Sequence, residues 1–331
     1  MKILLVRTDR IGDLILSTPA IASFRRSFPA AEIHALCSTY NQTVLRGNPD
    51  VDRVLTLPEE ERRHAAFGRS LSGEYDVAVS LAPVTRDYRL VAATGANVRV
   101  GYVYRRRWLG RLLAPRYFTR FAVSEADPDD ADRHPERPIR HEVVQVLELV
   151  LLAGGTSIVP HLVLPLQPED REAAARLIPE QGPVAVHYAE RWRTEGCARE
   201  CFVNLVTAAR DQLGKEVVVT YGKEARSEVE QLRSLVPADV RFVGDLTLHQ
   251  WAAVFERCAA VVTVDTGATH VAAATGRPTV VVFEHRYFRL NSQEWSPWGV
   301  PSALVRKPAH ADPESLARLC DDILEGLERV L

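Results

Sequence analysis

Short apolar runs recur along the first half of the chain, and helical or loop stretches separate them. Such runs are typical of strands that are buried within a parallel sheet. The predicted strands are 2–7, 32–37, 53–57, 76–81 and 98–102. The stretches predicted as helix or loop between them are 19–28, 59–73 and 86–95. This alternation predicts a parallel, doubly wound sheet.

The pattern breaks in the middle of the chain and then restarts. A helix predicted over 138–153 ends at Gly154-Gly155, and the proline-marked stretch from Pro160 to Pro168 is the best candidate for a linker. The strands predicted beyond it are 183–188, 216–220, 240–243, 259–264 and 279–283. The helices predicted beyond it are 200–213, 223–235, 247–257 and 268–275.

These two alternating halves predict an α/β protein with two Rossmann-like, doubly wound domains and an interdomain cleft. Length supports this division, because 331 residues are many for one compact core. We predict an N-terminal domain over 1–160 and a C-terminal domain over 161–312. A last helix within 313–331 is expected to pack back at the domain junction.

Composition narrows the class of protein. The longest apolar runs, such as 259–264 and 278–283, are far too short to cross a bilayer. The amino terminus enters a predicted strand at once, without the succession of a secretory signal, which predicts a cytoplasmic protein, free or at the inner face of the membrane. Five cysteines are scattered without CxxC or paired His/Cys spacing, so no metal site is predicted.

The formal net charge of −2 hides a basic stretch between Arg99 and Arg120. This stretch contains seven arginines and no acidic residue, with aromatic residues between the arginines, and should attract anions. Nucleic acid is a disfavoured partner, because no recognisable nucleic-acid module is present and the overall balance is acidic. We expect at most peripheral contact with a membrane. The seven arginines are Arg99, Arg105, Arg106, Arg107, Arg111, Arg116 and Arg120.

The stretch RTDRIGDLILSTPAI, residues 7–21, carries the first candidate for chemistry. It follows the apolar run from Ile3 to Val6 and precedes Thr18-Pro19, which are typical of a helix cap and first helical position. Asp13 therefore follows a strand at its carboxyl end, where ligands bind in open α/β sheets. The alternative is that Asp13 only caps a helical turn that starts at Leu14.

A second stretch, VDTGATHVAAATGRPTVVVFE at 264–284, is a predicted strand followed by a helix. Such a corner offers backbone N–H groups and the positive end of a helix dipole to a phosphate. The residues at the corner are Asp265, Thr266 and Gly267, and His270 lies in the first helical turn. The alternative is an ordinary capped helix. Neither half of the chain carries GxGxxG or a P-loop, which disfavours a standard dinucleotide site and a phosphorylating ATPase.

Together the two stretches resemble the ADP-heptose:lipopolysaccharide heptosyltransferase family, glycosyltransferase family 9. His141-Glu142, which opens a predicted helix, also matches the pattern, and the resemblance spans nearly the whole chain. It implies a GT-B fold in which the first domain binds the acceptor and the second binds the nucleotide-sugar donor. It also implies an inverting transfer that needs no metal or other cofactor, with ADP-heptose as co-substrate. The acceptor would be the lipopolysaccharide inner core, or another anionic glycan, glycolipid, protein or small metabolite.

The resemblance also implies a role for single residues. Asp13 matches the aspartate that takes the proton from the acceptor hydroxyl, and Glu224, in YGKEARSE, matches the acidic position for the nucleotide ribose. The donor would be bound by Asp265, Thr266, Gly267 and His270. The acceptor would be bound by Arg7, Thr8, Arg10 and Gly12.

The chain departs from the family at one position. Where relatives often have a lysine before Trp-Pro, the sequence reads HYAERWRTEGCARECF, which places Glu195 at the lysine and Cys197-Ala198 at Trp-Pro. Arg191 and Arg193 in the same loop could supply the missing charge, since a guanidinium fork suits a diphosphate. Of the two, we favour Arg193, because it lies nearer in sequence to the position of the family lysine. The alternative is that donor choice or activity has shifted.

Two other functions fit the same architecture. A sugar-nucleotide epimerase or hydrolase would consume the donor without any acceptor. A non-catalytic protein would keep the fold and bind without transfer, although the presence of both Asp13 and His270 argues against it. Donor turnover with and without acceptor distinguishes the three.

Overall fold

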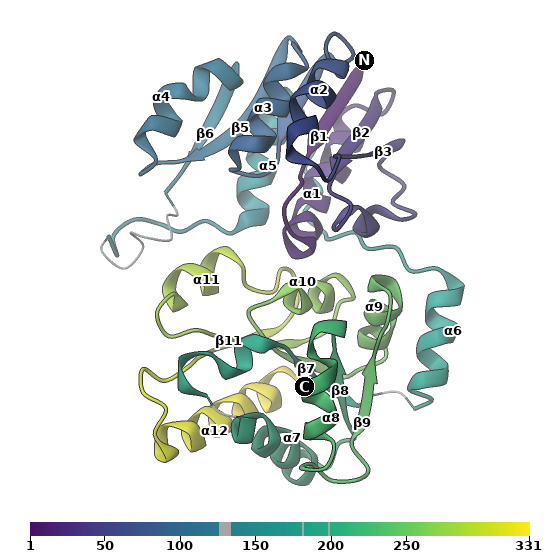
Figure 1. The fold of residues 1–331 in the computed structure, drawn as a ribbon, viewed down its shortest axis with the longest axis vertical. Coiled ribbons are helices and arrows are strands. Elements are labelled where there is room, and N and C mark those ends of the chain that lie inside the picture. The colour runs from purple at the N-terminus through teal and green to yellow at the C-terminus, as the bar shows by residue number, and fades with distance from the viewer. Residues whose placement is uncertain (126–133, 181, 198) are drawn as a thin grey trace. The chain divides into compact units, whose positions relative to one another are not determined.

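The computed structural model describes residues 1–125, 134–180, 182–197 and 199–331. The described chain divides into two compact units (Figure 1). Unit 1 contains Met1–Pro165 together with Gln293–Trp295, and unit 2 contains Leu166–Ser292 and Ser296–Leu331. Within the described ranges, no helix is both long and apolar enough to span a bilayer.

Unit 1 is built on a six-stranded sheet in which every described pairing is parallel. The strand order is β3-β2-β1-β4-β5-β6, so the chain starts in the middle of the sheet and winds outward in both directions. The predicted doubly wound α/β sheet is therefore confirmed. The strands are β1 Lys2–Val6, β2 Glu32–Cys37, β3 Arg53–Thr56, β4 Val77–Ser80, β5 Val98–Tyr104 and β6 Arg120–Ser124.

Helices cover both faces of this sheet. Helices α1 and α5 pack against each other, and α3 contacts α2 and α4 (Figure 1). Helix α4 and strand β6 were not predicted from the sequence. The helices of unit 1 are α1 Ile11–Ser27, η1 Gln42–Leu45, α2 Glu61–Ser70, α3 Thr85–Ala93, α4 Trp108–Tyr117 and α5 Glu142–Leu152.

The start of α1 corrects the prediction that this helix begins at Pro19. The helix begins at Ile11, and Pro19 lies inside it. Proline has no N–H to donate to the carbonyl four residues earlier, which normally breaks a helix. In α1 the hydroxyl of Thr18 donates to that carbonyl, on Ile15, at 2.7 Å. The helix therefore continues through the proline, and Asp13 lies in its first turn.

Unit 2 repeats the plan with a second six-stranded sheet, again parallel in every described pairing. Its order is β12-β11-β10-β7-β8-β9, and the residues of β7, β10 and β11 are all buried. Strand β12 was not predicted, because only alternate residues of this edge strand are buried. The strands are β7 Val184–Tyr188, β8 Val217–Tyr221, β9 Arg241–Gly244, β10 Ala260–Val264, β11 Thr279–Phe283 and β12 Ser302–Arg306.

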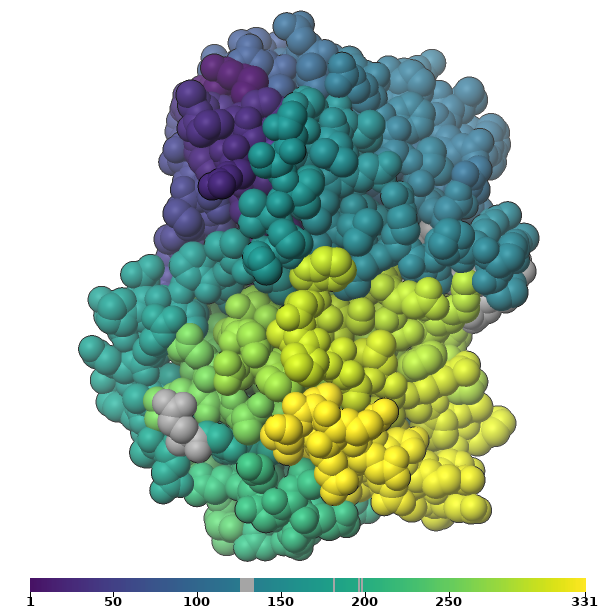
Figure 2. Space-filling view, turned by 180° about the vertical axis from the view of Figure 1, so that it is seen from behind, coloured from purple at the N-terminus to yellow at the C-terminus, as the bar shows by residue number. Residues whose placement is uncertain are grey.

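The last helix, α12, packs against β10, β11, β12 and α7. It therefore belongs to unit 2, where Figure 2 shows its yellow atoms at the surface, and the expectation that it packs back at the domain junction stays a prediction. Helices α6 and α11 were not predicted. The helices are α6 Pro168–Leu177, η2 Glu190–Gly196, α7 Arg199–Leu213, η3 Lys223–Ala225, α8 Arg226–Leu232, α9 Leu248–Glu256, α10 Gly267–Ala274, α11 Phe288–Glu294 and α12 Pro313–Val330.

Candidate functional site

Arg7 is the centre of a charged cluster in unit 1. It directly follows β1, and its side chain is only 3% exposed. Its guanidinium contacts the carboxylates of Asp9 at 2.9 Å, Glu142 at 2.6 Å and Asp13 at 3.4 Å, and it also donates to the carbonyl of Leu81. A buried charge needs such partners, because leaving it unpaired is costly. Arg7 therefore ties the first turn of α1 to the start of α5.

Glu142 holds the guanidinium of Arg7 from helix α5. It is the first residue of α5, is 1% exposed, and accepts hydrogen bonds from the Tyr102 hydroxyl at 3.0 Å to each carboxylate oxygen. His141 caps the same helix, since its Nδ1 accepts the N–H of Val143 at 3.1 Å. The pair His141-Glu142 was matched to the family pattern, but nothing in the sequence indicated that Glu142 holds Arg7.

Asp13 is the third residue of α1, and Arg10 occupies the N-cap position. The alternative that Asp13 caps a turn starting at Leu14 is therefore wrong. Burial raises the pKa of the Asp13 carboxyl to about 7, although the Arg7 charge opposes this shift and Asp9 reinforces it. With a side chain that is 19% exposed, Asp13 keeps a solvent-facing edge. A carboxyl that titrates near neutral pH is well placed to accept and release a proton.

The other residues predicted for the acceptor lie in different environments. Thr8 is buried, donates through its hydroxyl to Asp87 at 2.5 Å, and accepts from Arg86 at 2.9 Å. Gly12 is buried in the first turn of α1, whereas Arg10 is exposed. Arg10 is therefore the one predicted acceptor residue whose charge faces solvent, while Arg7 and Thr8 support the loop from inside.

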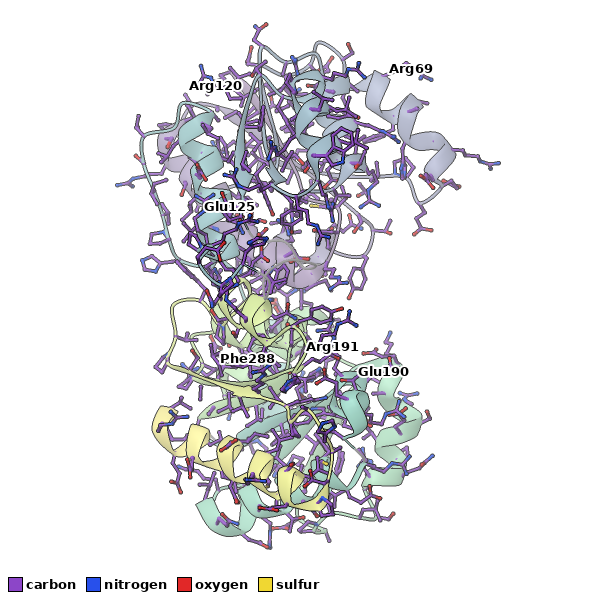
Figure 3. The ribbon with its side chains drawn as sticks, turned by 90° about the vertical axis from the view of Figure 1, so that its left-hand side faces the viewer. Arg69, Arg120, Glu125, Glu190, Arg191 and Phe288 are labelled. Carbon is purple, nitrogen blue, oxygen red and sulfur yellow. The ribbon has the colours of Figure 1, made fainter. Side chains whose placement is uncertain are left out.

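In unit 2, most of the predicted donor residues lie at the carboxyl end of β10, whereas Arg193 and Glu224 lie elsewhere. Arg191, labelled in Figure 3, donates to the Asp265 carboxylate at 2.6 Å and to the Asp265 carbonyl at 2.8 Å. Asn291 donates to the same carboxylate at 2.8 Å. Burial raises the pKa of Asp265, and Arg191 opposes the shift. The structure thus brings together two segments that are far apart in the sequence.

Helix α10 begins at this corner. Thr266 is its N-cap, but the Thr266 hydroxyl bonds to the carbonyl of Val264 at 3.2 Å, and no side chain caps the helix. The N–H of Thr269 donates to the Thr266 carbonyl at 3.1 Å. The N–H groups of Gly267 and Ala268 are not satisfied by a side-chain cap, and they could bind an anion together with the helix dipole. His270 lies in the same helix and is 5% exposed. The predicted phosphate site at this corner stays a prediction.

The structure separates the two arginines that were expected to replace the family lysine. Arg193 pairs with Glu228 at 2.7 Å, and the Tyr188 hydroxyl bonds the same carboxylate at 2.7 Å. Arg191 instead lies beside Asp265, next to α10. The preference for Arg193 rested on closeness in sequence and stays a prediction, although it is Arg191 that contacts Asp265, just before α10.

Glu195, at the lysine position, is turned into the protein. Its carboxylate accepts the backbone N–H groups of His285 at 2.6 Å and Arg286 at 3.2 Å, and its φ of 57° is in the left-handed region. These two bonds offset the cost of that conformation. Cys197 is buried, and Ala198 lies outside the described residues. The Glu195 carboxylate is therefore stabilised by two backbone N–H groups.

A lysine that the sequence did not indicate reaches the same loop. Lys307 follows β12, is 1% exposed, and donates through Nζ to the carbonyls of Arg191, Trp192 and Thr194, the last at 3.1 Å. It also donates to the Thr194 hydroxyl at 3.0 Å. Burial lowers the pKa of Lys307. Lys307 thus supports the backbone that carries Arg191, and no motif could have identified it because the contact exists only in the folded chain.

Glu224 is exposed in η3, which follows β8. Its carboxylate folds back over Gly222, where any Cβ would overlap the carboxylate oxygens. Glu224 thus lies after the carboxyl end of a parallel strand, and the predicted ribose contact stays a prediction. Among the residues described, no group of three or more His, Cys, Asp or Glu side chains could hold a metal ion.

A family model and the curated relatives indicate the same family. The family described as glycosyltransferase family 9 (heptosyltransferase) matches residues 64–318. Lipopolysaccharide heptosyltransferase 3 of Escherichia coli is 22% identical over 306 residues, which cover 87% of this chain and 83% of that protein. Lipooligosaccharide heptosyltransferase 2 of Haemophilus influenzae is 24% identical over 317 residues, which cover 86% of this chain and 83% of that protein.

Solved structures share the fold. A family 9 glycosyl transferase from Veillonella parvula has a TM-score of 0.78 at 17% identity, covering 99% of this chain and 96% of that chain. The E. coli heptosyltransferase WaaC with ADP-2-deoxy-2-fluoro heptose has a TM-score of 0.71 at 19% identity, covering 99% of both chains. The GT-B fold expected from the resemblance is therefore confirmed.

Proposed function

Because the chain belongs to glycosyltransferase family 9, we propose that this glycosyltransferase moves a heptosyl group from ADP-heptose to an acceptor hydroxyl, with inversion at the anomeric carbon. The donor is suggested by the relatives, which are named as heptosyltransferases, and by the WaaC structure, which holds an ADP-heptose analogue. The observation that carries the proposal is Asp13, a carboxyl whose pKa is raised to about 7 beside the buried guanidinium of Arg7.

In the proposed reaction, Asp13 is the general base. As the acceptor oxygen forms its bond to the anomeric carbon, the hydroxyl proton moves to an Asp13 carboxylate oxygen. The bond between the anomeric carbon and the diphosphate breaks on the opposite face, and its electron pair leaves with the diphosphate. A single displacement of this kind inverts the configuration. Arg7 favours the ionised form of Asp13, and Glu142 holds Arg7 in place.

The departing diphosphate needs positive charge, because its charge grows as the bond breaks. The N-terminus of α10 offers the backbone N–H groups at Gly267, and His270 lies in the same helix. Arg191 adds a guanidinium beside Asp265. Glu224 is proposed to bind the ribose hydroxyls, since an exposed carboxylate accepts two hydrogen bonds. No metal or other cofactor enters this scheme.

The proposed acceptor is an anionic glycan, and the lipopolysaccharide inner core is the first candidate because two relatives are named for lipopolysaccharide or lipooligosaccharide. Arg10 is exposed beside Asp13 in sequence and would contact anionic groups of such an acceptor. A glycolipid acceptor would place the protein at the inner face of a membrane.

The test begins with donor choice. Nucleotide sugars are screened by thermal shift, because a ligand that binds the folded state raises the melting temperature. Release of the nucleoside diphosphate is then measured with and without inner-core acceptor. We expect ADP-heptose to give the largest shift and ADP release to depend on the acceptor. Donor consumption without acceptor would indicate an epimerase or hydrolase, and binding without turnover would indicate a non-catalytic protein.

A further inference from the structure

Helix α4 carries an apolar face that no described part of unit 1 covers. Trp108, Leu109 and Leu112 are 65%, 53% and 69% exposed. Positions i, i+1 and i+4 lie on one side of a helix, so these three side chains form a continuous surface. Large apolar side chains grouped in this way mark an interaction site more often than single exposed ones do.

The opposite face of α4 holds the helix on unit 1. Ala114 is fully buried, and Phe118, directly after the helix, packs edge-to-face on Tyr88 with ring centroids 4.9 Å apart. The helix contacts α3 and β5, and Figure 1 shows it at the side of the sheet next to β6. The exposed face is therefore not needed to anchor α4 and is free for another function.

Arginines surround this apolar face. Arg106, Arg107, Arg111 and Arg116 are exposed, and within the described ranges none of the four has an ion pair. Arg107 lies over the ring of Tyr104 at 4.9 Å, and Arg111 donates to the carbonyl of Arg105 at 3.1 Å. These contacts order two of the guanidinium groups without neutralising them. Arg105 is the exception, since it pairs with Glu125.

We propose that α4 and the arginines around it dock the protein on an anionic lipid bilayer. Trp108, Leu109 and Leu112 enter the headgroup region, where an indole ring and short apolar side chains are stable. The arginines contact lipid phosphates and keep their charged ends at the interface. The combination of an apolar face with unpaired cations fits an anionic membrane better than a soluble partner, whose surface would have to match both.

The test uses the full chain and sedimentation with vesicles of phosphatidylcholine alone or mixed with phosphatidylglycerol. We expect binding to the mixed vesicles only, weakening as salt is added. Replacing the apolar face by Trp108→Gln, Leu109→Gln and Leu112→Gln should weaken binding by roughly ten-fold or more. The charge variant Arg106→Glu, Arg111→Glu should weaken it on the same order.

Two matched control variants locate the effect. Leu151→Gln removes another exposed leucine of unit 1, 54% exposed on α5, and Arg69→Glu reverses an exposed arginine on α2, labelled in Figure 3. Both should bind vesicles as the parent does. Thermal melts establish that every variant is folded, and calorimetric ADP binding should be unchanged, so that a failure of docking is distinct from a failure of the donor chemistry.

Several results would overturn the proposal. One is equal binding of the parent and both α4 variants to the mixed vesicles. Another is no vesicle binding by the parent at any salt concentration. A third is a parent that is dimeric in gel filtration and becomes monomeric in the apolar variant without any vesicle binding, which would assign the face to a second copy of the chain.

Discussion

Replacing Asp13 by asparagine should abolish most of the activity and, above neutral pH, stabilise the fold. Asparagine cannot take a proton from the acceptor, so turnover at saturating donor should fall by roughly two to four orders of magnitude. Donor affinity should not change, because the proposed donor site lies in unit 2 and is formed by other residues. The two effects on turnover and stability have a common origin in the raised pKa of the carboxyl.

The size of the stability effect follows from that pKa. The ordinary value is 3.8 and the folded value is about 7, a difference worth about 4 kcal/mol at roughly 1.4 kcal/mol per pKa unit. The folded state holds the proton more tightly than the unfolded chain does. Below pH 3.8, the Asp13 carboxyl therefore does not lower the free energy of unfolding. As pH rises, burial of the ionised carboxylate lowers this free energy more and more, and the effect is complete above pH 7. The difference in free energy of unfolding between Asp13→Asn and the parent should therefore grow from pH 3.8 to pH 7, where it reaches about 4 kcal/mol in favour of the variant.

Urea unfolding at a series of pH values measures the stability difference, and initial rates of ADP release measure turnover. Asp9→Asn is the matched control, because Asp9 also contacts Arg7 and raises the pKa of Asp13. This variant should keep transfer and shift the midpoint of its pH–rate profile below that of the parent, which we expect near pH 7. Near-parental turnover by Asp13→Asn, or a stability difference that does not change with pH, would refute the reasoning.

Three further predictions concern unit 2. Gly267→Val and His270→Ala should each weaken ADP binding by roughly ten-fold, the first by blocking close approach to the backbone; unchanged calorimetric affinity in both would move the phosphate site elsewhere. Arg191→Ala should lower turnover by at least roughly ten-fold with a smaller rise in the donor KM, whereas Arg193→Ala should stay within about three-fold; the reverse order in steady-state kinetics would contradict the assignment. Lys307→Met should lower the free energy of unfolding by about 1–3 kcal/mol, because it leaves loop carbonyls without a donor, and it should weaken ADP binding because Arg191 loses its support. Chemical denaturation and calorimetry on one preparation measure the two effects, and a variant as stable as the parent would contradict the prediction.

Most strands of both sheets could be predicted because they contain apolar runs, but β6 and β12 were missed. Strand β12 escaped notice because Ser302, Leu304 and Arg306 face solvent on a sheet edge, which leaves only alternate residues buried. The start of α1 was placed too late because proline is favoured at the first position of a helix. The sequence did not reveal that the Thr18 hydroxyl replaces the missing donor of Pro19.

The residues of the candidate site likewise fall into two groups, those that a sequence motif indicates and those that it does not. Asp13 and the corner from Asp265 to His270 could be predicted because each lies in one short motif. Their partners could not, because Glu142 and Lys307 come from distant parts of the chain and reach the site only after folding. The different partners of Arg191 and Arg193 could not be predicted for the same reason, since sequence distance within a loop does not fix the direction of a side chain.

The anomeric configuration of the transferred sugar tests the central claim most directly. The parent is supplied with ADP-heptose and inner-core acceptor, and the configuration of the new glycosidic bond is read from the one-bond carbon–hydrogen coupling in an NMR spectrum. A single displacement with Asp13 as the base predicts a configuration opposite to that of the donor. A product that retains the donor configuration would contradict the account.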